Sequence, residues 1–401
     1  MTQASVVVSK SEFLHGIRTV ERATSQLLIP YLYRVRMTTE GQGVRLFATD
    51  MLMGMTKWIP AVVTTGQLDL TIPLRELQAG IRKLPSGNIL ITQAENTDSI
   101  AIHSGRYDLR IKGASIQDFP SMPMVRSKAT PRQVTIQWNA RILQDISAKV
   151  AIAAATEDSR PVLTGVRVEI HQERATFVAA DGFRMAIYET NLDRPIGEHT
   201  SFIVSAKTIK EVARLSAEQS EPPRFIYSPE TSGIFWKLGS AEVMARPIQG
   251  AFPEYRELIP ASCNTRVVVS CSELIGALEF LSETGIHTSS ILKLQFDAES
   301  KRAYVLGAVQ DSDEAPIGII RAQVEISVIE MIGKSARIAI NQYYLGTALD
   351  ALGSDTKAMT IELTNDASPL VIRPAIESSD HSYLQVIMPM FVQWEEDEQL
   401  G

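Results

Sequence analysis

The residue types that supply catalytic or metal-binding chemistry occur in this sequence without the spacing that such chemistry needs. The 6 histidines are scattered singly, and Cys263 and Cys271 form no C-x-x-C pair. No G-x-x-x-x-G-K-[ST] phosphate loop, G-x-S-x-G elbow or H-E-x-x-H motif occurs. The acidic run at 311–314 lacks the spacing of a calcium loop, and an exposed loop is the simpler interpretation. Asp181 and Arg184 have no nucleophile or base beside them, so we expect no catalytic residue, no metal site and no cofactor.

Basic side chains are the residues that do share a chemistry, because lysine and arginine bind phosphate groups. Four of six predicted helices carry them beside an apolar stripe, such as Leu74, Leu77 and Ile81. A single row of this kind is typical of an ordinary solvated helix face. Recurrence in four helices favours a shared surface that faces a polyanion. The residues predicted to line this surface are Arg18, Arg22, Arg75, Arg82, Lys83, Arg141, Lys149, Lys207, Lys210 and Arg214.

The two remaining predicted helices do not carry positive charge. Residues 272–284 and 341–352 contain no lysine or arginine. Any nucleic-acid surface must therefore be uneven, and the last third of the chain lines it differently from the rest.

The elements that position these helices recur along the chain. Residues 6–12 (VVVSKSE) and 267–273 (VVVSCSE) agree at six of seven positions, 261 residues apart. Residues 134–140 (VTIQWNA) supply a divergent third copy between them. In each copy an alternating apolar run predicts a strand that leads into a helix.

Two of these copies carry a helix-capping signature. Ser9 with Glu12, and Ser270 with Glu273, fit the S-x-x-E capping box, in which each side chain accepts a hydrogen bond from a free backbone N–H group. We therefore expect both serines to cap the helices that follow them.

A second strand-to-helix unit recurs at 72–77, 203–207 and 338–342, and proline-containing segments at 118–123, 251–260 and 387–389 close each block. The spacing predicts three domains of about 130 residues, a size that suits one core each. We place them at 1–128, 129–260 and 261–401. The fold class is α+β, with two helices packed on antiparallel sheets in each domain.

Charge changes along these domains. The first has 15 basic and 10 acidic residues, the second 15 and 16, and the third 9 and 20. One interpretation is that a basic first domain and an acidic third one attract each other between subunits and guide head-to-tail contact. The alternative is an acidic soluble protein whose tail at 395–398 exaggerates the trend. No apolar segment predicts a membrane span and MTQASVVVSK does not resemble a secretory signal, so we expect a cytoplasmic protein with reduced cysteines.

Several short motifs together resemble the bacterial sliding clamp, the beta subunit of DNA polymerase III. They follow the order and approximate spacing of that family from residue 1 to about 391. The motifs are ATD at 48–50, RPVLTGV at 160–166, ADGFRMA at 180–186, FPEYR at 252–256 and MPM at 388–390.

The resemblance implies a ring made by a head-to-tail homodimer, with helices around a central hole for double-stranded DNA. It implies a non-catalytic processivity factor that slides on DNA without reading sequence. The expected partners are DNA polymerase, the clamp loader and other proteins with clamp-binding peptides. A three-repeat interaction scaffold, or a specialised clamp paralogue that does not encircle DNA, is the alternative.

The family binds partner peptides in an apolar pocket between its second and third domains, where methionine gives adaptable contacts. For Leu163 and Val386, ordinary burial at the domain boundary is an equally good interpretation. The resemblance places the pocket at Leu163, Ala180, Gly182, Phe183, Arg184, Met185, Pro253, Leu258, Tyr344, Val386, Met388, Pro389 and Met390.

Three features depart from the family pattern. Phe183 stands where histidine is frequent, and Glu257 stands where a basic residue is common. The chain also continues past MPM with 391–401 (FVQWEEDEQLG). Its Gln399-Leu400 pair is similar to part of a clamp-binding peptide, which suggests that the tail competes for the neighbouring pocket. A disordered acidic extension is the alternative.

Overall fold

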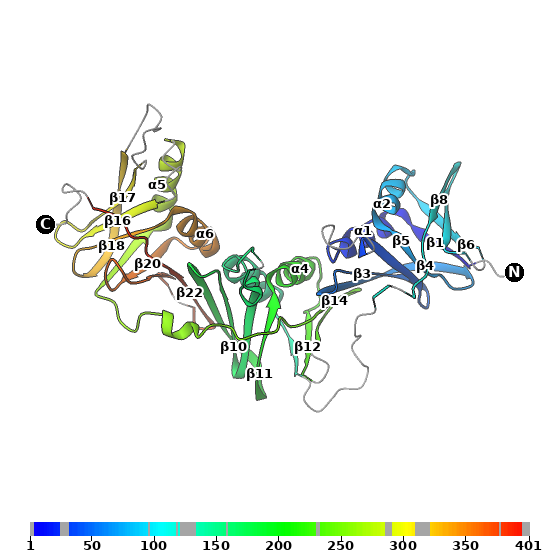
Figure 1. Cartoon of the computed structure of the whole chain (residues 1–401), viewed down its shortest axis with the longest axis horizontal. Coiled ribbons are helices and arrows are strands. Elements are labelled where there is room, and N and C mark those ends of the chain that lie inside the picture. The colour runs from blue at the N-terminus through cyan, green and yellow to red at the C-terminus, as the bar shows by residue number, and fades with distance from the viewer. Residues whose placement is uncertain are drawn as a thin grey trace. The chain divides into compact units, whose positions relative to one another are not determined.

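Among the residues described below, the strands of the computed structural model form two antiparallel sheets, one of 12 strands and one of 10. Figure 1 shows the helices and strands along the chain. The structure describes residues 4–24, 32–94, 97–117, 119–120, 134–157, 159–229, 233–284, 291–308, 321–376 and 378–394. The acidic run at 311–314, the boundary predicted at 128 and the tail residues 395–401 lie outside this part of the chain.

Six α-helices occur in the described residues, all at predicted places. The third continues as a π-helical turn, η2 (Ile146–Val150), which the sequence pattern did not predict. Two short 3-10 helices are η3 (Pro161–Thr164) and η4 (Tyr255–Leu258). The α-helices are α1 (Lys10–Glu21), α2 (Leu74–Lys83), α3 (Ala140–Asp145), α4 (Ala206–Ala217), α5 (Cys271–Glu283) and α6 (Gln342–Leu352).

The 12-stranded sheet contains β1 (Ala4–Ser9), β2 (Arg34–Thr39), β3 (Gly43–Thr49), β4 (Met53–Thr65), β5 (Asp69–Pro73), β6 (Asn88–Gln93), β7 (Ser99–Ser104), β8 (Tyr107–Lys112), β9 (Val134–Gln137), β12 (Arg224–Ser228), β13 (Gly233–Leu238) and β14 (Ala241–Ala245). The 10-stranded sheet contains β10 (Gly165–Ala180), β11 (Arg184–Ser205), β15 (Thr265–Ser270), β16 (Ile291–Asp297), β17 (Arg302–Ala308), β18 (Arg321–Gly333), β19 (Ala336–Asn341), β20 (Ala358–Leu363), β21 (Leu370–Pro374) and β22 (His381–Ile387).

The two strand-to-helix units that the sequence predicted each occur three times in the structure. The first kind is β1–α1, β9–α3 and β15–α5, and the second is β5–α2, β11–α4 and β19–α6. The apolar stripe of α2 is buried as predicted, with Leu74, Leu77 and Ile81 fully inside, while Arg75 and Arg82 are exposed. Helices α1 and α2 contact each other, and so do α5 and α6.

The helix caps correct one prediction. Ser9 and Ser270 occupy the N-cap positions of α1 and α5, but neither makes a side-chain cap hydrogen bond. Each serine hydroxyl instead lies 2.9 Å from the hydroxyl of Ser11 or Ser272. Glu273 Oε2 accepts a hydrogen bond from Ser327 N at 2.6 Å, so a neighbouring strand takes the carboxylate that the capping box would use.

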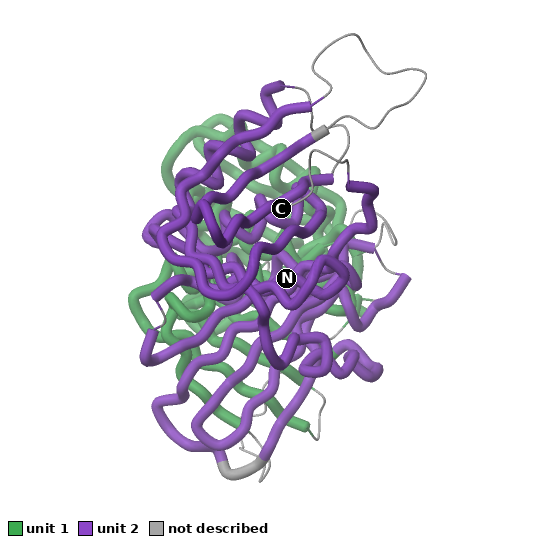
Figure 2. Tube along the Cα trace, turned by 90° about the vertical axis from the view of Figure 1, so that its left-hand side faces the viewer, with its two compact units in different colours: residues 1–144, 210–247 green, residues 145–209, 248–401 purple. Residues whose placement is uncertain are grey.

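Two compact units divide the described structure, each built on one of the sheets (Figure 2). Unit 1 comprises 1–144 and 210–247, and unit 2 comprises 145–209 and 248–401. The division between the units runs through the predicted second domain. Its strands β9, β12, β13 and β14 join the 12-stranded sheet, while its strands β10 and β11 join the 10-stranded sheet. The boundaries at 128 and 260 stay predictions.

Both cysteines are free, and both lie in unit 2. Cys263 is exposed, whereas Cys271 is the buried first residue of α5. Burial raises the pKa of the Cys271 thiol above its ordinary value. No helix among the described residues is long and apolar enough to cross a membrane.

Candidate nucleic-acid and peptide interfaces

Most of the predicted DNA-binding side chains are solvent-exposed on their helices. The apolar positions on either side of them pack inward, as the helical period requires. The exposed residues are Arg18, Arg22, Arg75, Arg82, Lys83, Arg141, Lys207 and Lys210, and the half-buried ones are Lys149 and Arg214. Their contact with DNA stays a prediction.

Described acidic residues form ion pairs with Arg22 and Arg214. Arg22 Nη1 lies 2.9 Å from Glu211 Oε1, so this pair joins α1 to α4. Arg214 contacts both Glu211, at 2.9 Å, and Glu218, at 2.7 Å. These arginines have part of their charge compensated within the protein, so we expect each to attract phosphate more weakly than an unpaired arginine would.

Lys149 lies against the sheet of unit 2. Its Nζ is 3.0 Å from Asp145 Oδ1, one helical turn earlier, and lies 5.7 Å and 5.8 Å from the ring centroids of Tyr188 and Tyr383. Tyr383 Oη donates to Lys149 O at 3.2 Å. This lysine therefore has a packing role that sequence spacing did not reveal.

The ADGFRMA motif forms a tight turn between β10 and β11. Asp181 Oδ1 accepts hydrogen bonds from the backbone N–H groups of Phe183 and Arg184, each at 2.9 Å. Gly182 has φ +97°, which side chains rarely tolerate. The turn places Phe183 outside and returns Arg184 to the protein interior.

Arg184 joins three separate segments of unit 2. Its Nε donates to Asp181 Oδ2 at 3.0 Å, its Nη2 donates to Ile152 O at 2.6 Å, and its Nη1 donates to Thr347 Oγ1. The guanidinium carbon also lies 4.8 Å from the ring centroid of Tyr344. Only 5% of this side chain is exposed, so Arg184 positions the site from beneath.

Aromatic and methionine side chains surround this arginine at the surface. The rings of Phe183 and Tyr344 are stacked with centroids 6.5 Å apart, and Tyr343 lies 5.8 Å from Tyr344. Met388 N donates to Phe183 O at 2.8 Å, which brings the MPM segment to the same place. We call Phe183, Tyr343, Tyr344 and Met388 the Phe183 surface. Phe183 and Tyr343 are 63% and 64% exposed, a degree of exposure that favours contact with a partner.

The other predicted pocket residues fall into two groups in unit 2. Leu163, Ala180, Met185 and Val386 belong to one buried core cluster, so burial within the chain accounts for Leu163 and Val386. Gly182, Pro253 and Leu258 are exposed, while Pro389 and Met390 are half-buried. Four of these nine predicted residues therefore belong to one core, and the other five are exposed or half-buried.

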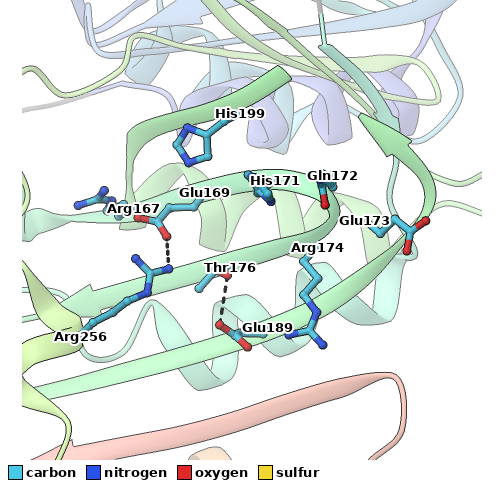
Figure 3. Close-up of a pocket in the computed structure, with 10 residues that line it drawn as sticks. All are labelled: Arg167, Glu169, His171, Gln172, Glu173, Arg174, Thr176, Glu189, His199 and Arg256. Carbon is cyan, nitrogen blue, oxygen red and sulfur yellow. Dashed lines mark hydrogen bonds and ion pairs between the residues drawn. The ribbon is translucent and has the colours of Figure 1, made fainter. Parts of the chain in front are cut away.

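A buried carboxylate holds the FPEYR segment in place. Glu169 Oε2 accepts a hydrogen bond from Arg256 Nη2 at 2.7 Å (Figure 3). It also accepts one from Tyr255 Oη at 2.9 Å, and Glu169 Oε1 lies 2.7 Å from Arg167 Nε. Burial raises the pKa of the Glu169 carboxyl, but the bonds from Arg256 and Tyr255 outweigh burial and lower it below 4.5. This anchor fixes η4, which carries Leu258.

The Glu169 cluster lies at one end of a cavity of about 560 Å³ on strands β10 and β11 (Figure 3). Arginine, glutamate and histidine side chains line it, with His171 and His199 rings 5.7 Å apart. Its charged lining distinguishes it from the apolar Phe183 surface, and no predicted site residue lines it.

Two parts of the chain match descriptions of one protein family. Residues 4–123 match the DNA polymerase III beta subunit, N-terminal domain, and residues 137–254 match the central domain of the same subunit. The chain belongs to the bacterial sliding clamp family. The beta sliding clamp of Synechococcus elongatus is 26% identical over 376 residues, which cover 92% of this chain and 95% of the relative.

Solved sliding clamps share the fold. The beta subunit of DNA polymerase III from Thermotoga maritima superposes with a TM-score of 0.83 at 23% identity, covering 97% of this chain and all of that one. The sliding clamp from Bartonella birtlesii bound to griselimycin gives the same TM-score, identity and coverage. The predicted α+β class and the family resemblance are confirmed.

Three members of this clamp's candidate site were missed in the sequence. Thr347, Ile152 and Tyr343 contact Arg184, yet they lie on segments far from it in the chain. Two other groups that contact Arg184 were visible in the sequence: Asp181, three residues away within ADGFRMA, and Tyr344, which the family resemblance predicted.

Proposed function

We propose that this protein is a DNA sliding clamp, a processivity factor without catalytic chemistry of its own. Two copies would close head to tail around double-stranded DNA and tether DNA polymerase to it. A clamp remains on DNA because it is topologically closed, so weak and sequence-independent phosphate contacts suffice. Family membership supports this function. The observation that supports ring closure is a pairing between strands of successive repeats, which occurs in both units.

The same kind of sheet junction occurs once in each unit. In unit 1, β14 pairs with the first part of β4, from Ala241 opposite Lys57 to Ala245 opposite Met53. In unit 2, β22 pairs with the first part of β11, from Ile387 opposite Arg184 to His381 opposite Thr190. Each junction joins the last strand of one repeat to the long strand of the preceding repeat.

One set of equivalent strands has no such junction in the part of the chain that the structure describes. Strand β8 pairs only with β7, and residues 321–327 of β18 pair only with β17. Open strand edges invite pairing with another chain. A second copy would supply β8 to β18, and symmetry would repeat this contact and close the ring.

Helix charges support the same contact. At the junction in unit 1, Arg22 of α1 meets Glu211 of α4. The 261-residue repeat offset puts Glu279 and Glu283 of α5 where α1 has Arg18 and Arg22. Helix α2, which would face α5 from the second copy, exposes Arg82 and Lys83. In this contact the acidic residues lie on α5 and the basic residues on α2, the reverse of the α1–α4 contact, so the two helices still carry complementary charge.

An exposed aromatic residue marks the same face of α5. Phe280 is 48% exposed, whereas Thr19, at the equivalent position of α1, is buried. A partner helix would cover Phe280 and remove its apolar surface from water. This supports α5 as an intersubunit helix and explains why it lacks lysine and arginine.

The Phe183 surface is the proposed docking site for peptides of DNA polymerase, the clamp loader and other clamp-binding proteins in the cytoplasm. Stacked aromatic rings and exposed methionine offer adaptable apolar contact, and the buried Arg184 network holds them in place. Of the thirteen predicted pocket residues, the exposed and half-buried ones remain proposed peptide contacts, and the buried ones are proposed to support them. The ten predicted DNA-binding residues also remain part of the proposed function.

Retention on circular DNA tests encirclement. The protein, loaded onto a nicked circle by a clamp loader, should remain bound during gel filtration and dissociate after the circle is cut once. Equal loss from circular and linear DNA would instead favour the interaction scaffold that never encloses DNA.

A further inference from the structure

The chain beyond the MPM motif follows the edge of the sheet in unit 2. Met390 N donates to Ala339 O at 2.7 Å. Ala339 lies on β19, the last strand in the order of the 10-stranded sheet, which pairs with β16 on its other side. The segment that starts at the Phe183 surface is therefore fastened to β19 two residues later.

Trp394 fastens the segment a second time. The indole ring centroid lies 4.6 Å from the guanidinium carbon of Arg337 and 5.1 Å from Lys293 Nζ. Lys293 Nζ also donates to Gln393 O at 3.3 Å. Lys293 is opposite Ala339 and Arg337 is opposite Gln295 in the β16–β19 register, so both cations lie on one face of the sheet. Tryptophan is the aromatic residue that binds cations best.

Phe391 lies between these two attachments, and 91% of it is exposed. It follows Met390, whose backbone is fixed on β19, and comes three residues before Trp394. An aromatic side chain on a fixed backbone loses little conformational entropy when a partner covers it. Such residues are frequent among those that dominate binding energy.

We propose that Phe391 extends the Phe183 surface, and that Trp394 with Lys293 and Arg337 is the latch that positions it. The occupant is a partner peptide that carries an apolar side chain beyond the residues bound at the Phe183 surface. The proposal rests on the peptide-tethering function proposed above. It gives Phe391 and Trp394 a role in binding partners.

Two synthetic peptides test the extension. The short one contains the glutamine and leucine of the clamp-binding motif, and the long one adds two residues and a phenylalanine at both ends. Phe391→Ala should weaken the long peptide about tenfold and the short peptide less than twofold, measured by fluorescence anisotropy. Ile376→Ala removes a side chain of similar exposure, 89%, elsewhere in unit 2 and should change neither.

The latch has its own pair of variants. Trp394→Ala should weaken the long peptide by raising its dissociation rate, whereas Trp394→Phe keeps a ring over the two cations and should restore most of the affinity. Equal affinity of the long peptide for Phe391→Ala and wild type would overturn the extension. Equal loss for both Trp394 variants would overturn the latch. Failure of the short peptide to bind wild type would instead refute the peptide-tethering function itself.

Discussion

At the residue scale, two buried charged side chains hold the candidate peptide site together. Arg184 and Glu169 each bind segments that are distant in sequence, and neither lies at the surface that a partner would touch. Sequence motifs identified Arg184 but assigned it to the pocket wall. Its partners Ile152 and Thr347 could not be predicted, because only tertiary packing brings their oxygen atoms to the guanidinium group.

Replacing Arg184 with methionine preserves bulk and removes every hydrogen bond. Asp181 would lose its buried counter-ion, so we expect the free energy of unfolding to fall by about 3–5 kcal/mol. Chemical denaturation measures this, with Arg141→Met as the exposed control. Peptide affinity should fall as well, since the turn that presents Phe183 loses its support. A loss as small as that of the control would contradict the assigned role.

Glu169→Gln tests the second anchor and its pH dependence. At neutral pH we expect a loss of about 1–3 kcal/mol in the free energy of unfolding, because Tyr255 and Arg256 keep only a neutral acceptor. The pKa of Glu169 is lower in the folded protein than the ordinary 4.5, so its stabilisation is present above that value and disappears as pH falls through the folded pKa.

The difference between wild type and Glu169→Gln should therefore shrink below about pH 4.5 in thermal unfolding scans. Glu173 lines the same cavity but is exposed, so Glu173→Gln serves as the matched control. A constant difference across the acid range would show that the carboxylate charge is not what stabilises η4.

At the element scale, the helices were predictable and their ends were less so. The apolar stripe of α2 and the strand before each helix follow from local periodicity. The capping box predicted for α5 failed because Ser327 N donates to the Glu273 carboxylate, a contact set by the position of β18 rather than by local sequence. The π-helical turn after α3 was missed for a similar reason, since Lys149 packs against Tyr188 and Tyr383 from distant strands.

Helix α4 offers the most direct test of phosphate binding. Lys207 and Lys210 are both exposed on this helix, where phosphate groups can reach them. The double variant Lys207→Ala, Lys210→Ala should weaken DNA binding equally for all sequences. It should also reduce the slope of log affinity against log salt by about 0.9 for each phosphate that the protein no longer neutralises. Lys301→Ala removes an exposed lysine from a strand turn and should leave the slope unchanged.

At the scale of the whole molecule, ring closure depends on contacts that one chain cannot make with itself. Changing Glu279 and Glu283 of α5 to lysine should weaken the dimer about tenfold or more, because α2 of the second copy already exposes Arg82 and Lys83. Changing Arg82 and Lys83 to glutamate should have a similar effect. Both pairs of changes in one chain should restore association, as measured by analytical ultracentrifugation.

A control substitution elsewhere in unit 2 and the salt dependence of dimerisation make this test specific. Glu299→Lys changes an exposed acidic residue of a strand turn in unit 2 and should leave dimerisation unaltered. The wild-type dimer should weaken as salt is raised, and the restored variant should behave alike. If the variant with all four changes is folded but does not regain dimerisation, α5 and α2 do not contact each other in the dimer.

Thiol labelling of the two cysteines measures how often helix α5 detaches from the core of unit 2. Exposed Cys263 should react with a thiol reagent at once, whereas buried Cys271, whose thiol has a raised pKa, can react only when α5 leaves the core. The slow phase of labelling therefore reports how often this helix detaches. If α5 is covered by a second subunit, that phase should slow as protein concentration rises, so one reagent would time both local unfolding and the opening of the ring.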